Sequence, residues 1–282
     1  MSLCFFKVDS YFFGVNIMKS KKLIVIFSIL VFLTVLVVLS STIFTLQNVS
    51  INWMTTKYKL LTIDDEQLTS DIILGKSIFL IDKEEITSNL EKKYPYLRVV
   101  GVETKFPNKI VIHSAEREVL FAVKKADDNY ALLDEFGKVL ENNKSLDSLT
   151  QGTSLLSSTP IKVDFQSLSL KEEDFVNGEI VKVAHIEKMI SKLAYSFKES
   201  NYSPTTSKGV FQNIDILSDS QHETVNITTR RGIVIKLKDA EEYTTDKLLV
   251  GLARYNAVHN QGIVEYTIEV RYDSLSGRVE AS

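Results

Sequence analysis

Cysteine is almost absent from this chain, which holds a single one, Cys4, among 282 residues. The long segment after it therefore has no disulfide and must rely on an apolar core for stability. The chain also has only four histidines, at positions 113, 185, 222 and 259, and their spacing is not that of metal ligands. We expect no metal site and no cofactor.

Signatures of catalysis are equally scarce. The sequence has no glycine-rich phosphate loop, no HExxH, no nucleophile elbow and no Ser-x-x-Lys of the penicillin-binding kind. Carboxylates cluster at Asp64-Asp65-Glu66, which is typical of a helix start, and at Glu172-Glu173-Asp174, which is typical of a solvated run. We expect a non-enzymatic protein, and a membrane-tethered hydrolase with an acid–base carboxylate pair is the alternative.

No block of one charge sign stands out. Lysine and arginine number 33 against 36 aspartates and glutamates, and the two signs are intermixed to a net charge of −3. Nucleic-acid binding needs a concentrated basic surface, so this class of partner is excluded.

What the chain does have is one long apolar run, Leu23 to Phe44. Its length of about 22 residues matches the roughly 30 Å hydrocarbon core of a bilayer. Lys19, Lys21 and Lys22 stand directly before it, and no basic cluster follows at once. The positive-inside rule then predicts a cytoplasmic tail (1–22), a transmembrane helix (23–44) and an extracytoplasmic remainder.

A cleaved signal peptide and a buried core helix are the alternatives for this run. A signal peptide has a shorter apolar region that ends in small residues, and Ser40-Ser41-Thr42 fits that poorly. We therefore favour an uncleaved anchor. Residues 1–17 are too short and too interrupted to span, Met18 before Lys-Ser-Lys-Lys is a more conventional start, and we assign this segment no role.

The part after the anchor, about 235 residues, is long enough for two ordinary domains. Its first portion, 45–115, reads as a β-α-α-β-β unit. Thr62 and Asp82 are the expected helix caps, Gly75 and Pro95 the expected stops, and Ile86 and Leu90 the buried face of the second helix. Strands are expected at 44–53, 98–106 and 109–115, and helices at 62–74 and from Asp82 to Tyr94.

The second portion, 116–275, begins with the polar joint Glu116-Arg117-Glu118 and reads as a mixed, β-rich domain with two helices, so the fold class is α+β. Residues 276–282 are expected to be a tail. Strands are expected at 119–124, 130–133, 211–217, 224–229, 233–237 and 263–272, helices at 178–197 and 244–258 (capped by Thr244 or Thr245), and loops at 142–158 and 201–209.

Several motifs resemble the FtsQ/DivIB cell-division proteins, in the order found in that family. In the first portion they are Gly75-Lys-Ser-Ile-Phe79-Leu-Ile-Asp82, Tyr94-Pro95-Tyr96-Leu97, Phe106-Pro107-Asn108-Lys-Ile-Val-Ile112, Glu116-Arg117-Glu118 and Leu133-Asp134 followed by Gly137-Lys-Val139. In the second they are Asn213-Ile-Asp215-Ile, Gly232-Ile-Val-Ile-Lys-Leu237, Thr245-Asp-Lys-Leu-Leu249 and Glu269-Val-Arg271-Tyr272-Asp273-Ser274.

The resemblance implies a bitopic plasma (inner) membrane protein of the division septum, with a POTRA domain and then a β domain. Such proteins bind FtsB/FtsL-type partners and other divisome components, and they help control septal peptidoglycan synthesis without being enzymes. The alternative is a POTRA-bearing membrane protein of a polypeptide export or assembly system. Such proteins carry repeated POTRA units, whereas this chain has one.

The resemblance also implies where partners bind. In the family the partner adds along the last strand of the β domain, and Arg271, Tyr272 and Ser274 match that edge here. An exposed strand edge offers unpaired backbone groups, a mode of binding known as β-augmentation. On the POTRA domain, Val102, Thr104 and Lys105 lie where the family meets upstream partners.

Overall fold

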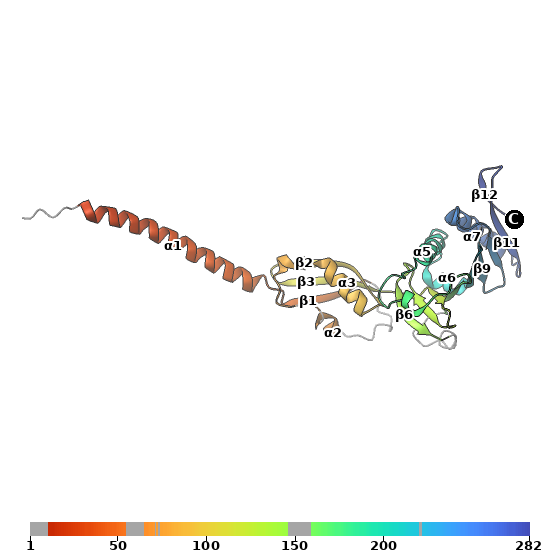
Figure 1. The fold of residues 1–282 in the computed structure, drawn as a ribbon, viewed down its shortest axis with the longest axis horizontal. Helices are drawn as coiled ribbons and strands as arrows, with labels where there is room; N and C mark the ends of the chain where they lie inside the picture. The colour runs from red at the N-terminus through yellow and green to blue at the C-terminus, as the bar shows by residue number, and fades with distance from the viewer. Residues whose placement is uncertain (1–10, 55–64, 71, 73, 146–158, 220–221) are drawn as a thin grey trace, which may run out of the picture.

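The computed structural model describes residues 11–54, 65–70, 72, 74–145, 159–219 and 222–282. Three parts follow one another along an extended molecule (Figure 1): helix α1 (Tyr11–Ile43), a small three-stranded unit and a larger sheet domain that ends in strand β12. The α+β architecture predicted from the sequence is confirmed.

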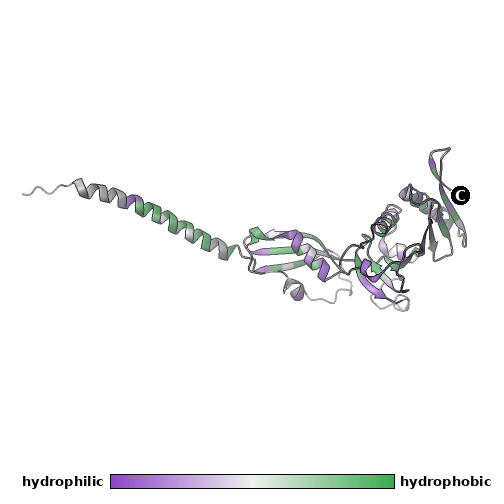
Figure 2. Ribbon diagram, in the orientation of Figure 1, coloured by the Kyte–Doolittle hydropathy of each residue, from purple (hydrophilic) through white to green (hydrophobic). Residues whose placement is uncertain are grey.

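Helix α1 stands alone. Its window Lys21–Val38 has a mean hydropathy of 2.6 and buries none of its surface against the rest of the chain, so the core-helix alternative is wrong. The apolar residues form an uninterrupted band along it (Figure 2). Within the described residues it is the one helix long and apolar enough to cross a membrane. Helix α1 begins at Tyr11. It therefore includes residues 11–17, which the sequence predicts to be part of the tail before the helix.

The small unit has the predicted order. Its elements are β1 (Asn48–Trp53), α2 (Asp65–Ser70), the 3-10 turn η1 (Ile78–Leu80), α3 (Lys83–Lys93), β2 (Leu97–Lys105) and β3 (Lys109–Glu116). The sheet order is β1-β3-β2, with β1 parallel and β2 antiparallel to β3. Helix α2 is shorter than predicted, and its expected cap Thr62 lies outside the described residues.

Local chemistry fixes helix α3 as the sequence predicts. The Asp82 carboxylate accepts hydrogen bonds from the backbone N–H groups of Glu84 (2.9 Å) and Glu85 (3.1 Å), which caps the first turn. Leu90 is buried, and Ile86 packs on the same cluster of apolar residues under the sheet. Gly75 adopts a φ of +90°, the left-handed conformation expected of it as a stop.

The larger domain is built on one nine-stranded sheet with the order β12-β11-β10-β9-β8-β7-β4-β5-β6. Its strands are β4 (Phe121–Lys124), β5 (Tyr130–Leu133), β6 (Val139–Lys144), β7 (Ile161–Phe165), β8 (Phe211–Ser218), β9 (Glu223–Thr229), β10 (Val234–Leu237), β11 (Thr267–Asp273) and β12 (Arg278–Ala281). Its helical elements are the 3-10 turn η2 (Glu172–Asp174), α5 (Ala184–Glu199), α6 (Pro204–Val210) and α7 (Thr244–Asn260).

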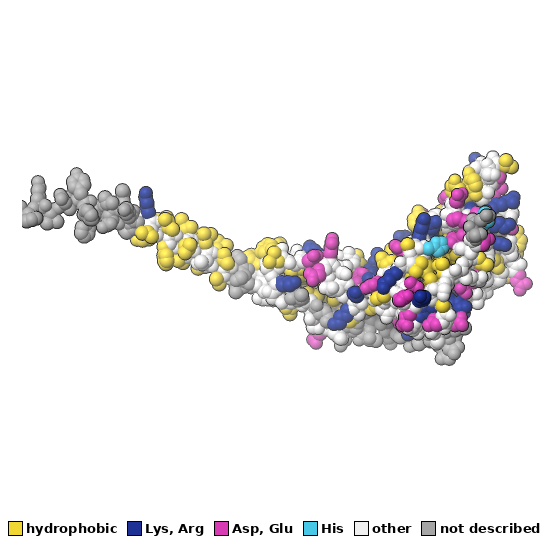
Figure 3. Space-filling model, viewed as in Figure 1, with side chains coloured by type: hydrophobic (Ala, Val, Ile, Leu, Met, Phe, Trp, Pro, Cys, Tyr) yellow, Lys and Arg dark blue, Asp and Glu magenta, His cyan; other side chains and the backbone are white. Residues whose placement is uncertain are grey.

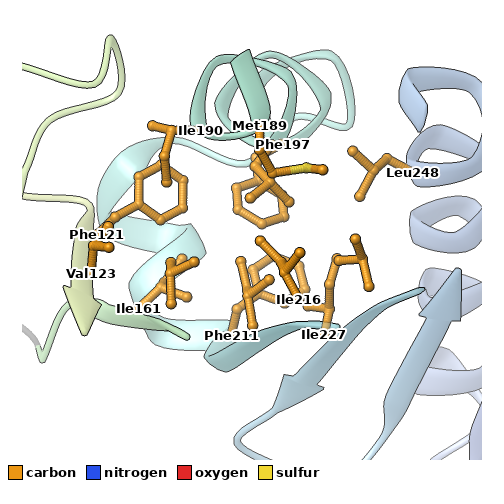
Figure 4. Packing of buried hydrophobic residues seen from close by; sticks show 14 of the residues in the cluster. Phe121, Val123, Ile161, Met189, Ile190, Phe197, Phe211, Ile216, Ile227 and Leu248 are labelled. Atoms are coloured by element: carbon orange, nitrogen blue, oxygen red, sulfur yellow. The ribbon is translucent and has the colours of Figure 1, made fainter. Parts of the chain in front are cut away.

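Helices α5 and α7 lie side by side over one face of this sheet. The apolar core lies between these helices and the sheet (Figure 4). Phe197 of α5 stacks on Phe211 of β8 with ring centroids 4.6 Å apart. Gly251 lets α7 approach the sheet, because a Cβ there would lie 2.7 Å from Ile235 Cγ2 and 3.2 Å from Val270 Cγ2. The opposite face carries polar side chains along β7, β8 and β9 and a small apolar cluster on β4, β5 and β6.

Three segments differ from prediction near the middle of the domain. Strand β6 extends to Lys144 and so includes the first residues of the predicted loop 142–158. Strand β7 was not predicted, although Ile161, Val163 and Phe165 alternate and are buried between β4 and β8. Helix α5 starts at Ala184 rather than Gly178, because residues 178–180 bond to the edge of β6 instead of forming a helical turn.

Two further corrections concern helix starts. The segment 201–209, predicted to be a loop around Pro204, holds helix α6, because Ser203 caps it and proline fits the first helical position. Helix α7 begins as predicted, but neither threonine caps it. The cap position is Tyr243, in the left-handed region at φ 52°, and the Thr244 hydroxyl donates to the carbonyl of Ala240.

The two domains meet at a buried cluster of charges centred on Arg117. Its guanidinium donates to Asp134 Oδ2 (2.6 Å) in the β domain and to Glu91 Oε2 (2.8 Å) on helix α3. Lys138 from the β5–β6 turn reaches the same Glu91 oxygen at 2.6 Å. The joint predicted as merely polar is thus a salt bridge network whose members are no more than 13% exposed.

Close backbone contact completes this junction. Gly178, at φ +78°, lies so near the end of α3 that a Cβ on it would be 2.6 Å from the carbonyl oxygen of Lys92. The Tyr96 hydroxyl donates to Glu141 across the junction, and its ring packs on a small apolar cluster of the β domain. These contacts hold the two domains in one arrangement.

Replacing Gly251 with alanine should lower the free energy of unfolding by about 1 kcal/mol, because the overpacking cost of about 1–3 kcal/mol exceeds the gain in helix propensity. Gly209, in helix α6, is the matched control, since nothing lies within 4 Å of a Cβ built on it. Gly209→Ala should stabilise by about 0.4–1 kcal/mol. Urea unfolding of both variants measures this, and equal effects would contradict the close packing at Gly251.

Replacing Glu91 with glutamine should destabilise the junction by about 3 kcal/mol at neutral pH, because buried partners lose their counter-charge. Burial raises the pKa of Glu91, but the Lys138 ammonium, the Val99 N–H and the Arg117 charge together hold it below its ordinary 4.5. Stability from the carboxylate is therefore complete above pH 4.5 and is lost as the pH falls through the lower folded pKa.

The difference between wild type and Glu91→Gln should consequently narrow in acid, as measured by thermal unfolding across pH. Glu84→Gln, an exposed position on the same helix, is the control and should change little at any pH. A gap for Glu91→Gln that stays constant down to acid pH would contradict the assignment.

Candidate functional site

The edge of the large sheet formed by the last residues of the chain differs from the prediction in two respects. Residues 276–282, expected to be a tail, contain strand β12, which pairs antiparallel with β11 along its full length. Strand β11 begins at Thr267 rather than Ile263 and is not the last strand. The backbone of Arg271 is therefore paired with β12, and the open edge of the sheet is the outer side of β12.

A tight turn makes this hairpin. Asp273 Oδ1 accepts a hydrogen bond from the Leu275 N–H (3.0 Å), and the Asp273 carbonyl accepts from Gly277 N–H (2.9 Å). The Leu275 N–H, together with Ser276, lowers the pKa of Asp273 and keeps its carboxylate charged. Gly277 supplies the positive φ of 67° that lets the chain reverse. Four residues, Arg278–Ala281, were too few for sequence alternation to reveal.

Hydrogen bonding within the hairpin determines which backbone groups β12 leaves free. Glu269 and Ser282 exchange both of their backbone hydrogen bonds, at 3.1 and 3.0 Å. In an antiparallel ladder bonded and non-bonded pairs alternate, so Glu280 bonds to Arg271, whereas Val279 and Ala281 turn their N–H and C=O groups outward. Among the described residues no strand pairs with these groups.

The other edge of the same sheet is covered. The Val139 carbonyl on β6 accepts from Gly178 N–H (2.8 Å), and Val139 N–H donates to the carbonyl of Glu179 (2.9 Å). Further along β6, the Asn142 amide donates to the Phe175 carbonyl at 2.8 Å. Such a cover prevents strand addition. The sheet is thus open at β12 and covered along β6.

An aromatic pair flanks the open edge on the helix side. Tyr272 is 38% exposed and stacks on Tyr243, the cap residue of α7, with ring centroids 4.6 Å apart and planes 12° from parallel. Tyr272 follows buried Val270 by two residues on β11, so both side chains lie on the same face of the sheet, the face that α7 covers. The sequence could not reveal Tyr243, because it lies far from Tyr272 in the chain. Repulsion between the two phenolate groups, together with desolvation, raises the pKa of Tyr243.

Arg271 points to the opposite, polar face. It shares that face with Glu269, whose hydrogen bond from Lys238 lowers its pKa, and it sits opposite Glu280 on β12. Ser274 lies exposed in the hairpin turn. The three predicted residues are therefore close in the chain but do not form one surface, since Arg271 and Tyr272 face opposite sides of the sheet.

The predicted POTRA residues are likewise divided between two faces. Strand β2 is an edge strand of the small sheet. The side chains of Val102 and Thr104 lie on the face of this strand that is turned toward helix α3. Val102 packs against the core there and also lines a polar hollow beside Lys138 and the Gly178 turn. Lys105 points the other way and pairs with Glu103 at 3.6 Å.

The polar face of the large sheet has one hollow with paired carboxylates. Asp164 on β7 lies in register with Asp215 on β8, and burial together with the Asp164 charge raises the pKa of Asp215. Lys124 reaches Asp164 at 3.7 Å, and both of these side chains are about one-third exposed. Because Asp164 and Lys124 are exposed to solvent, the hollow that holds the two carboxylates is an open surface feature rather than an enclosed acid–base site.

The two acidic runs have local structural roles where they are described. Asp65 and Glu66 begin helix α2, and Asp64 lies outside the described residues. In η2, Asp174 accepts from the Lys171 backbone N–H at 2.8 Å, and Glu172 accepts from the Asn143 amide at 2.5 Å.

The fold and the open edge define a class: a chain with one apolar helix, one POTRA-type unit and a β domain that offers a strand edge. Residues 58–117 match the family model described as a POTRA domain of the FtsQ type. This match covers the small unit from before α2 to the junction at Arg117.

The chain is similar to the cell division protein DivIB of several bacteria. It is 30% identical to that of Clostridium botulinum strain Hall over 131 residues, which is 46% of this chain and 49% of the relative. It is 30% identical to that of Bacillus cytotoxicus over 145 residues (51% and 50%) and 29% identical to that of Bacillus anthracis over 143 residues (50% and 47%). The matches span about half the length of these relatives. The predicted resemblance to the FtsQ/DivIB family is confirmed.

Proposed function

We propose that this protein is a non-enzymatic divisome scaffold that binds FtsB/FtsL-type partners by β-augmentation along β12. The observation that carries the proposal is the open edge of β12, at the end of the molecule farthest from α1 (Figure 1). The similarity to DivIB cell-division proteins supports the cellular role, which is to help control septal peptidoglycan synthesis. The FtsQ-type POTRA match favours this role over polypeptide export or assembly.

Recognition at the edge has a backbone part and a side-chain part. The outward N–H and C=O groups of Val279 and Ala281 form the ladder with a partner strand. On the helix face, the partner's side chains meet Val279 and the Tyr243–Tyr272 pair, a rigid aromatic surface. On the polar face they meet Glu280, with Arg271 behind it, which can pair with a partner carboxylate.

The arrangement in the membrane follows from the same proposal. Helix α1 spans the plasma membrane once, the residues before it are cytoplasmic, and both domains are extracytoplasmic at the septum. The basic residues before the apolar run support this orientation. The β2 edge, with Val102, Thr104 and Lys105, is the second proposed contact, for other divisome components.

Replacing Val279 with proline should weaken partner binding at least tenfold, which corresponds to about 1.4 kcal/mol. Proline removes the outward N–H without breaking a bond to β11, and edge strands tolerate it for that reason. Val279→Ala keeps the N–H and is the matched control, with a smaller loss. Titration with the extracytoplasmic segment of an FtsB/FtsL-type partner measures both, and equal affinity for Val279→Pro and wild type would rule out strand addition here.

Replacing Tyr272 with alanine should weaken the same interaction while the domain remains folded, since the side chain is partly exposed and its stacking contributes about 0.5–1.5 kcal/mol. Tyr195→Ala, at a tyrosine 52% exposed on α5, is the control and should bind as wild type does. Circular dichroism checks the fold and calorimetric titration the affinity. Should Tyr272→Ala bind normally, the aromatic pair has no part in recognition.

A further inference from the structure

Three phenylalanines from distant parts of the chain gather at the end of the POTRA unit where α1 enters. Phe44 follows the last residue of α1, Phe79 lies in η1, and Phe106 begins the turn between β2 and β3. Their ring centroids are 5.2 Å apart for Phe44–Phe79, 5.5 Å for Phe79–Phe106 and 6.4 Å for Phe44–Phe106. We call these three residues the aromatic cluster.

The aromatic cluster does not belong to the core of the unit. Phe79 and Phe106 are each 64% exposed, and the neighbouring Leu80 is 78% exposed. The core lies on the other side, around Leu46 and Ile110, and contains none of the three rings. A contiguous exposed apolar patch of this kind marks a surface that binds a membrane or another protein. Figure 3 shows hydrophobic side chains along α1 and on the end of the unit next to it.

The link between α1 and the sheet gives the cluster a fixed position. Only Phe44–Gln47 separate the helix from β1, and they are bonded on both sides. Ile78 N–H donates to the Phe44 carbonyl (2.7 Å), Leu46 N–H to the Lys76 carbonyl (2.8 Å), and Gln47 N–H to the Asn108 carbonyl (3.0 Å). The η1 segment and the β2–β3 turn are therefore held directly at the helix end.

The length of the apolar run sets the depth of that end. From Leu23 to Phe44 a helix rises about 33 Å, close to the thickness of the hydrocarbon core, so Phe44 reaches the level of the lipid headgroups. Because Phe79 and Phe106 contact Phe44, they lie at the same level. Interfacial segments bury phenylalanine and leucine side chains at this depth, at the boundary between headgroups and acyl chains.

We propose that the aromatic cluster, with Leu80, inserts into the outer leaflet of the membrane and seats the POTRA unit on the lipid surface. The occupant of the patch is lipid, because Phe44 directly follows α1, whose apolar surface the bilayer itself covers. The proposal requires that α1 spans the membrane, but it does not depend on any partner of β12.

The experiment uses the full chain in lipid nanodiscs without any other protein. Phe79 is changed to tryptophan in a chain whose single tryptophan is replaced by Trp53→Phe, and quenching by lipids brominated near the headgroup end of the acyl chain is measured. Leu275→Trp in the same background is the control, since Leu275 is 97% exposed in the far hairpin turn.

We expect Phe79→Trp to lose most of its emission to the brominated lipid and to shift its spectrum to the blue, and Leu275→Trp to do neither. Phe106→Trp should behave like Phe79→Trp, which guards against a local effect of one substitution. Quenching of Phe79→Trp and Phe106→Trp no greater than that of Leu275→Trp would overturn the proposal, because the cluster would then lie in water or await a protein partner.

Discussion

The bridge that Arg117 makes between Glu91 and Asp134 is the constraint on which the geometry of the molecule depends. One guanidinium engages carboxylates from two domains, and Lys138 adds a second cation to the same oxygen of Glu91. Buried charges tolerate little displacement, because each one moved from its partner is left without solvent or counter-charge. The junction therefore fixes the position of the small unit, which follows α1, relative to the domain that carries the edge of β12.

The sequence motifs that resemble the family have a physical explanation at this junction. The Glu116-Arg117-Glu118 stretch and the Asp134 to Val139 stretch are separate in the chain, yet Arg117 and Lys138 meet on Glu91. Asp134 also accepts the backbone N–H groups of Phe136 and Lys138, both at 2.9 Å, which shapes the turn that presents Lys138. Residues that look like a solvated linker in the sequence are buried once two domains close on them.

The sequence predicted the elements whose pattern is long and regular, and it failed where a contact distant in the chain decides the structure. Strands β8 and β9 and the buried face of α5 follow from alternation and helical periodicity. Residues 178–180 pair with β6 rather than starting α5, and Tyr243 becomes part of the candidate site only through Tyr272; neither partner is visible from local pattern. Strand β12 is too short to show a periodic pattern, so the sequence predicts the open edge at β11 rather than at β12.

The shortness of β12 has a consequence for how tightly a partner can bind. Val279 and Ala281 offer four outward backbone groups, and at about 0.5–1.5 kcal/mol for each hydrogen bond they supply about 2–6 kcal/mol. A micromolar complex needs about 8 kcal/mol, so the backbone ladder alone falls short, and the side-chain contacts proposed at Tyr272 and Glu280 have to supply the difference. Anchoring both chains in one membrane would strengthen the proposed pairing in the way that linking two binding modules does, because it keeps the chains near each other without any new contact.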